Sequence, residues 1–305
     1  MRRLVKKLES FRRLPKYDRL SSILYKLGLN RLGDVSVAIL LKLKFSRLSF
    51  FTSDNNEKYS KDLEFIVTPG FDDKIPVFIC WLQGFNNAPD LVKLCRKSVY
   101  KYFDSDVYHV CELNDKNIHS FVQLPDIVLE KYQNGVISKT HYSDIVRTLI
   151  VYTYGGVWVD STMMFYAGVP SEICNSEIFF FKTPDSYGRL VSNQFIYGKC
   201  AGNPLLGEMV AALYEFWHAN DDVGSYFFYH YLITAIIEKR YLGAFKTMPS
   251  YCSALNHELQ KLFDHQFDDG IFQECVNKSF VQKLSYKHSY IVAESFLARL
   301  LSDNI

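Results

Sequence analysis

Asp160 ends a short apolar run, "VWVD", and two hydroxyl side chains, Ser161 and Thr162, follow it directly. A carboxylate at the end of a strand can bind ribose hydroxyls or a divalent cation that bridges phosphates. The two hydroxyls can add oxygen ligands to a cation or donate hydrogen bonds to a phosphate. Asp, Ser and Thr are also common turn formers, so a plain turn at the end of a strand is the alternative interpretation.

Asp144 and Arg147 precede this strand and stand three residues apart, so a helix places them on one face. Beside Asp160 such a pair can hold sugar hydroxyls, whereas on a surface it forms an ordinary local ion pair. Gly155 and Gly156 join the helix to the strand. Two glycines permit a tight reversal, and without side chains they leave room for a ligand's backbone or phosphate.

The stretch "WLQGFNNAP" begins at Trp81, directly after an apolar run that is typical of a strand. A tryptophan in this position can stack on a planar base, and Gln83, Asn86 and Asn87 can form hydrogen bonds with that base. The alternative is that the tryptophan is a core residue and the Asn-rich loop a turn.

Lys283, Lys287 and His230 are weaker candidates. The two lysines lie in a strand-like run and can meet a diphosphate leaving group, although surface lysines are the simpler interpretation. His230 lies among aromatic residues in "YFFYHYL", where a core histidine with a satisfied hydrogen bond is the usual case.

The elements that must position these residues alternate along the chain. Continuous apolar runs predict strands at 75–82, 107–113, 157–161 and 177–182. Helical spacing predicts helices at 88–103, 141–156, 203–220 and 225–240, the second with Ser143 as its cap and Gly155 as its stop. This alternation predicts an α/β fold with a largely parallel sheet and helices on both faces. Ligands of such sheets bind at the carboxyl ends of the strands.

The composition is that of a soluble α/β enzyme. The chain has 305 residues, of which 48% are hydrophobic and 22% charged. Its seven cysteines are scattered, and no CxxC pair occurs. A zinc site is therefore not expected, and buried thiols in a reducing compartment are.

The first part of the chain is strongly basic. Residues 1–50 contain 13 Lys and Arg and three acids, whereas the rest of the chain has a net charge of −8. Leu, Phe, Ile and Tyr alternate with the basic residues, as in a segment that lies on an anionic membrane surface. A solvated helical face is the alternative, and no nucleic-acid motif occurs. We expect a helical leader and linker at 1–62, and a cytoplasmic protein that touches the inner face of a membrane.

The motifs combine in an order that resembles a known family. The sequence "WxQG" with "NAP", then "SDxxRxxxxYxYGGVWxD[ST]T", then "HYL" and "KLSYK" resembles the capsular-polysaccharide-synthesis branch of glycosyltransferase family 32. The resemblance covers roughly residues 74–290. It implies a GT-A fold over 63–305, in which a Rossmann-like sheet binds a nucleotide-sugar and is flanked by helices. It also implies a retaining hexosyltransferase that uses a nucleotide-sugar, most simply a UDP-sugar, and extends a capsular or surface saccharide, either free or lipid-linked.

The resemblance also assigns residues. Trp81 matches the residue that stacks on the donor base, and Asp144 and Arg147 match the pair that grips the donor sugar. Asp160 matches the first acid of the DXD motif, whose second position is Thr162 here. Asp160 is therefore the one acid of the motif left to bind Mn²⁺ or Mg²⁺. The expected donor site is completed by Gln83, Gly84, Gly155, Gly156, Ser161, Thr162, Lys283 and Lys287, and the acceptor candidates, on position alone, are Asn193, Gln194 and His230.

Two other functions stay open at this point. The missing second acid also suits a degenerate nucleotide-sugar-binding protein. A nucleotide-sugar hydrolase would need a base that activates water, and the sequence shows no dedicated Glu–His constellation for that task.

Overall fold

The computed structural model describes residues 70–71, 73–287 and 292–302, together with positions 41, 44, 45, 47 and 48. Most of the basic leader thus lies outside the described residues, and its contact with a membrane stays a prediction. Among the helices that the structure does describe, none is both long and apolar enough to cross a bilayer.

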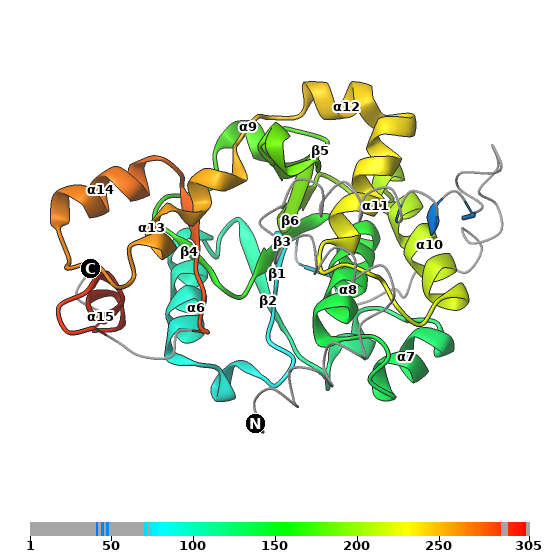
Figure 1. Ribbon diagram of the computed structural model, residues 1–305, viewed down its shortest axis with the longest axis horizontal. Helices are drawn as coiled ribbons and strands as arrows, with labels where there is room; N and C mark the ends of the chain where they lie inside the picture. Colours follow the sequence, from blue (N-terminus) through cyan, green and yellow to red (C-terminus); the bar gives the residue numbers. More distant parts are fainter. Residues whose placement is uncertain are drawn as a thin grey trace, which may run out of the picture. The chain divides into compact units, whose positions relative to one another are not determined.

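A five-stranded sheet with the order β2-β1-β3-β6-β5 organises the fold (Figure 1). Its strands are β1 (Ile75–Cys80), β2 (Tyr108–Leu113), β3 (Gly156–Asp160), β5 (Ile178–Lys182) and β6 (Val191–Gly198). Strand β1 pairs in parallel with both β2 and β3, whereas β6 runs antiparallel to β3 and β5. The sheet is therefore mostly parallel with one reversed strand, and the predicted α/β class is confirmed.

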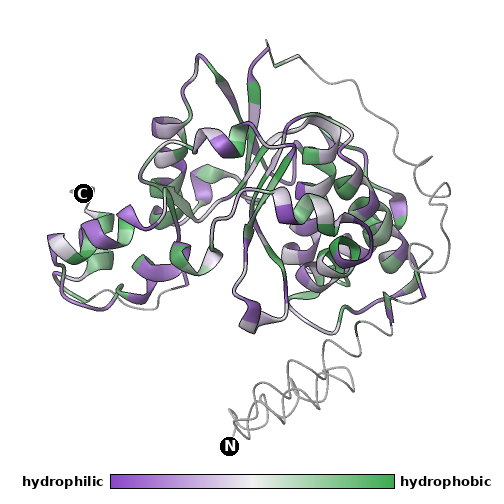
Figure 2. Cartoon of the chain, turned by 90° about the horizontal axis from the view of Figure 1, so that it is seen from above, coloured by the Kyte–Doolittle hydropathy of each residue, from purple (hydrophilic) through white to green (hydrophobic). Residues whose placement is uncertain are grey.

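The central strands β1 and β3 are apolar because both of their faces are covered. Val77, Phe78 and Ile79 in β1, and Val157 and Val159 in β3, are almost fully buried. The strands of the sheet carry mainly hydrophobic colour in Figure 2. Continuous burial explains why these strands read as uninterrupted apolar runs in the sequence.

Two compact units make up the described chain. A helical unit holds residues 124–145 and 208–242 with the described positions before residue 49, and a sheet unit holds the rest. The helices are α6 (Asp90–Tyr102), α7 (Asp126–Gln133), α8 (Lys139–Tyr154), α9 (Ser171–Cys174), α10 (Pro204–Ala219), α11 (Phe228–Ile236), α12 (Leu242–Thr247), α13 (Glu258–Lys261), α14 (Asp269–Asn277) and α15 (Phe296–Leu301). The boundary between the units falls within α8 and α10.

A second, two-stranded sheet belongs to the sheet unit. Strand β4 (Met163–Phe165) follows Asp160 closely and pairs antiparallel with β7 (Val281–Lys283), in a register that sets Met163 opposite Lys283. Helices α13, α14 and α15 surround an apolar cluster that includes Met164 and Leu284. This cluster attaches the end of the chain to the segment that leaves β3.

The predicted elements agree with the structure where the signal was a long apolar run. Strands β1, β2, β3 and β5 and helices α6, α8 and α10 lie where they were expected. Ser143 as a helix cap is wrong, because α8 begins at Lys139 and Ser143 lies inside it. The helix expected at 225–240 is α11, which ends at Ile236 and continues as a π-helical turn over Ile237–Tyr241.

Gly155 is the predicted stop of α8, and the structure confirms it. Its φ of 70° is left-handed, and its N–H donates to the Val151 carbonyl. Gly156 starts β3 with a φ of 77°, and a Cβ there would lie 2.2 Å from the Pro76 carbonyl oxygen. A Cβ on Gly155 would meet the backbone of Cys200 at 2.8 Å. Close packing against backbone is thus a sufficient reason for a glycine at both positions. Both glycines lie at the opposite end of β3 from Asp160.

Candidate active site

Asp160 lies at the carboxyl end of β3, in the middle of the sheet. The parallel register with β1 sets Asp160 opposite Cys80, and Trp81 follows Cys80 directly. Two residues that the sequence singled out separately are therefore at the same edge of the sheet. This edge is where open α/β sheets bind their ligands.

Both carboxylate oxygens of Asp160 have cationic partners. Oδ2 lies 2.6 Å from Lys283 Nζ, and Oδ1 lies 2.9 Å from Arg147 Nη1. The Trp158 indole N–H also donates to Oδ1, at 3.2 Å. The three residues Arg147, Asp160 and Lys283 form what we call the ion cluster. Its formal charge is +1, because two cations share one acid.

Arg147 is the rigid member of the ion cluster. Its side chain is 7% exposed, and its guanidinium lies over the Trp158 ring at 5.2 Å from the centroid. It also donates to the backbone carbonyl of Asn193 at 2.8 Å. A planar guanidinium with a carboxylate, a carbonyl and an aromatic face as partners is fixed in orientation.

The pKa of Asp160 lies below its ordinary value. Burial acts in the other direction and would raise this pKa. The charges of Arg147 and Lys283 outweigh burial, with help from the hydrogen bonds that Lys283 and Trp158 donate. Asp160 is therefore a carboxylate at neutral pH, and the ion cluster keeps its excess positive charge.

Lys283 reaches Asp160 from a segment 123 residues further along the chain. The β4–β7 ladder brings it there, and the Leu284 N–H extends this ladder by donating to the Thr162 carbonyl at 2.8 Å. Lys287, the other candidate lysine, is exposed, and its backbone N–H donates to Ser285 Oγ. Of the two lysines, Lys283 is the one that the structure brings to Asp160.

Asn193 and Gln194 lie at the same edge of the sheet. Strand β6 is antiparallel to β3 and pairs Phe195 with Val159, so its first residues lie beside the end of β3. Both polar side chains are buried. Gln194 Nε2 is a buried donor with no hydrogen-bond partner among the described residues. Such a group is one that a bound ligand can satisfy.

Trp81 packs edge-on against Tyr286, with ring centroids 5.2 Å apart and an interplanar angle of 84°. Its indole N–H is buried and lacks a hydrogen-bond partner in the described part of the chain. Gln83 and Gly84 follow in the loop, where the Gly84 N–H donates to the Trp81 carbonyl. Sequence reasoning missed Tyr286, although it lies between the two candidate lysines, because an aromatic in a polar run carries no signal by itself.

Asp144 and His230 belong to the helical unit. Asp144 is buried on α8, and its Oδ2 lies 3.4 Å from His141 Nδ1. His230 lies on α11, with its ring centroid 5.6 Å from that of Phe227. The assignment of Asp144 to the donor sugar and of His230 to the acceptor stays a prediction.

A divalent cation does not fit the donors of this arrangement. No group of three or more His, Cys, Asp or Glu side chains suited to a metal occurs among the described residues. Asp160 is the one acid of the motif, and both of its oxygens face cations. Thr162, at the second position of the motif, is buried, and its carbonyl accepts from Leu284. Lys283 would have to leave before a metal could approach Oδ2.

Comparison with known proteins identifies the family. A solved structure titled "PaToxG Glycosyltransferase" aligns with 70% of this chain and 80% of its own, at 16% identity and a TM-score of 0.38, which is too weak to support an argument about function. No curated protein matches the chain. The family model described as capsular polysaccharide synthesis protein matches residues 40–300. This match spans most of the sequence, and the chain therefore belongs to the family of capsular polysaccharide synthesis proteins.

Proposed function

We propose that the protein is a GT-A glycosyltransferase that moves a hexose from a nucleotide-sugar to a saccharide acceptor during the synthesis of a capsular or surface polysaccharide. The observation that carries the proposal is the ion cluster at the carboxyl ends of β1 and β3. Its excess positive charge suits a diphosphate, and the nearby Trp81 suits a base. A UDP-sugar is the simplest donor, and retention of configuration follows from the resemblance.

Each member of the ion cluster has a task in this proposal. Arg147 holds the Asp160 carboxylate in one orientation, and this carboxylate would accept a hydrogen bond from a ribose or sugar hydroxyl. Lys283 is 21% exposed and can meet the diphosphate. Positive charge there stabilises the negative charge that develops on the leaving phosphate as the sugar becomes oxocarbenium-like.

Further parts of the proposal concern the acceptor and the membrane. Asn193 and Gln194 lie beside the end of β3, where a group bound next to the donor sugar would lie. The basic leader would contact anionic lipid and keep the enzyme near a lipid-linked acceptor. Both parts require that the protein binds a nucleotide-sugar at the ion cluster, so donor binding and turnover are tested first.

Slow hydrolysis of nucleotide-sugars tests the proposed activity without knowledge of the acceptor. A panel of UDP- and GDP-sugars is incubated with the wild type, with Asp160→Ala and with Asp106→Ala, which changes an exposed acid away from the ion cluster. We expect turnover of one donor, a loss of at least about 100-fold in Asp160→Ala, and no change in Asp106→Ala. Absence of turnover together with absence of nucleotide binding would leave a sugar-binding or scaffold role instead. Fast turnover that no acceptor accelerates would identify a hydrolase.

Nucleotide binding should also change the fluorescence of Trp81. This tryptophan is partly exposed, whereas Trp158 and Trp217 are buried. We expect UDP or GDP to shift the emission of the wild type and of Trp217→Phe, and to shift that of Trp81→Phe less, because only Trp158 beside Asp160 then reports on the site. Because Trp81→Phe loses the indole N–H but keeps an aromatic face, its affinity should fall about tenfold. A nucleotide affinity of Trp81→Phe equal to that of the wild type would remove this residue from the base site.

A further inference from the structure

We propose that Lys283 is a built-in cation of the donor site, so that nucleotide binding and sugar transfer need no divalent metal ion. The inference rests on the proposed function and adds to it the nature of the group that faces the diphosphate. It departs from the resemblance, which implies Mn²⁺ or Mg²⁺ on Asp160.

The first argument is that Lys283 already lies where a metal would bind. Its Nζ is 2.6 Å from Asp160 Oδ2, while Oδ1 accepts from Arg147 and Trp158. A cation that approached Asp160 from the remaining side would meet a cluster whose charge is already +1. Like charges at such short range repel strongly in a partly buried site.

The second argument is a balance of charge. A second acid with a divalent cation would contribute a net charge of +1 to the site. Here the second position is the neutral Thr162, and Lys283 contributes the same +1 alone. The loss of the acid and the presence of the lysine thus leave the charge that a diphosphate encounters unchanged.

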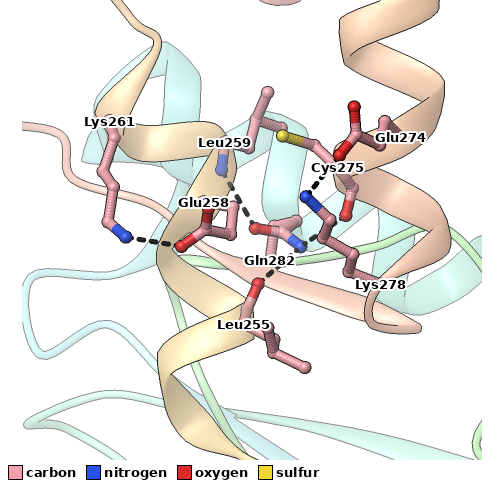
Figure 3. Close-up of polar contacts among 8 residues, drawn as sticks. All are labelled: Leu255, Glu258, Leu259, Lys261, Glu274, Cys275, Lys278 and Gln282. Carbon is pink, nitrogen blue, oxygen red and sulfur yellow. Dashed lines mark hydrogen bonds and ion pairs between the residues drawn. The ribbon is translucent and has the colours of Figure 1, made fainter.

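The third argument is that the fold holds Lys283 in place. Neighbouring residues of a strand point to opposite sides, so Gln282 points away from Asp160. The buried Gln282 side chain accepts from the Leu259 N–H and donates to the carbonyls of Leu255 and Cys275 (Figure 3). These three hydrogen bonds fix β7 from behind, and the pairing of Met163 with Lys283 fixes its register. An ordinary surface lysine has no such support.

The chemistry balances without a metal. The bond between the anomeric carbon and the β-phosphate oxygen breaks, and its electron pair stays on that oxygen. The acceptor hydroxyl oxygen forms the new bond to the anomeric carbon, and its proton goes to the departing phosphate. Lys283 Nζ has three N–H donors, and Asp160 takes one in the described contacts. The others can donate to the phosphate, while Lys283 itself keeps its proton throughout.

The test is the affinity for UDP and GDP, measured by calorimetry with metal-free protein in chelator and again in Mn²⁺. We expect the dissociation constant of the wild type in chelator to be within about threefold of its value in Mn²⁺. Lys283→Met should weaken binding in chelator at least tenfold, and Lys283→Arg, which keeps the charge, should restore most of it. Lys278→Met, which changes an exposed lysine paired with Glu274, should bind as the wild type does.

The possible failures differ from one another. Wild-type binding that is lost in chelator and restored by Mn²⁺ would overturn the inference and leave the proposed function standing. Affinity in chelator that is the same in Lys283→Met as in the wild type would also overturn it. If neither nucleotide binds under either condition, the proposed function fails and the inference fails with it. The comparison of the wild type in chelator with the wild type in Mn²⁺ keeps the inference falsifiable even if Lys283→Met does not fold.

Discussion

Asp160→Asn is expected to lower the free energy of unfolding by about 3 kcal/mol at pH 7. The substitution keeps the shape of the side chain but removes the one negative charge of the ion cluster. Arg147, which is almost fully buried, then loses its ion pair with Asp160. Removal of one member of a buried ion pair is costly mainly because the other charge stays buried without compensation.

The dependence of this effect on pH follows from the direction of the pKa shift. The pKa of Asp160 is lower in the folded protein than in the unfolded chain. Its contribution to stability is therefore fully present above the ordinary carboxyl pKa of about 4 and is lost as the pH falls through the lower, folded pKa. The difference between the wild type and Asp160→Asn should be constant from pH 8 to about pH 5 and shrink below about pH 4.

Urea unfolding of both proteins from pH 8 to pH 3.5, followed by circular dichroism, measures this difference. Asp106→Asn is the matched control, because Asp106 is exposed, and its effect should stay within about 0.5 kcal/mol. A difference that already declines between pH 8 and pH 5 would mean that burial dominates and raises the pKa of Asp160. In that case the ion cluster would not hold Asp160 as a carboxylate, and its role beside a diphosphate would have to be reconsidered.

The sequence predicted the site best where one strand and its end were involved. Asp160 and Trp81 each follow an apolar run, and the rule that parallel strands end at one edge was enough to expect them together. The register of Cys80 with Asp160 bears this out. Strand β6 was missed because Ser192, Asn193 and Gln194 interrupt its apolar pattern, although these polar residues lie where the strand reaches the ligand edge.

The partner of Asp160 was harder to predict because it depends on tertiary structure. Lys283 was one of two candidate lysines, and nothing local separates it from Lys287. The pairing of β4 with β7 makes the choice, and each of these strands has only three residues. Strands this short give no periodic signal. For the glycines the structure offers a different reason from the predicted space for a phosphate, because a Cβ on Gly156 would meet the Pro76 carbonyl.

The largest expected effect on stability comes from Gln282, a residue of β7 that is not part of the ion cluster. Gln282→Leu is expected to lower the free energy of unfolding by on the order of 4 kcal/mol. Gln282 is fully buried, and its three hydrogen bonds are all to backbone groups at distances of 3.1–3.2 Å (Figure 3). Leucine has nearly the same volume, so it leaves no large cavity, but it removes the acceptor of the buried Leu259 N–H. It also removes one donor each from the carbonyls of Leu255 and Cys275, the second of which still accepts from the Lys278 N–H.

Chemical unfolding measures this loss, and Gln273→Leu, at an exposed position of α14, is the matched control. If Gln282 acts through Lys283, the substitution also weakens nucleotide binding in chelator under conditions where the variant is folded. The double variant Gln282→Leu/Lys283→Met should then bind nucleotide no more weakly than Lys283→Met alone. The reason is that Lys283→Met has already removed the ammonium group whose position Gln282→Leu would disturb. Additive losses would show that Gln282 supports the fold alone. The stability of the C-terminal helices and the position of the cation would then be separate properties, and Lys283 would owe its place to the β4–β7 register.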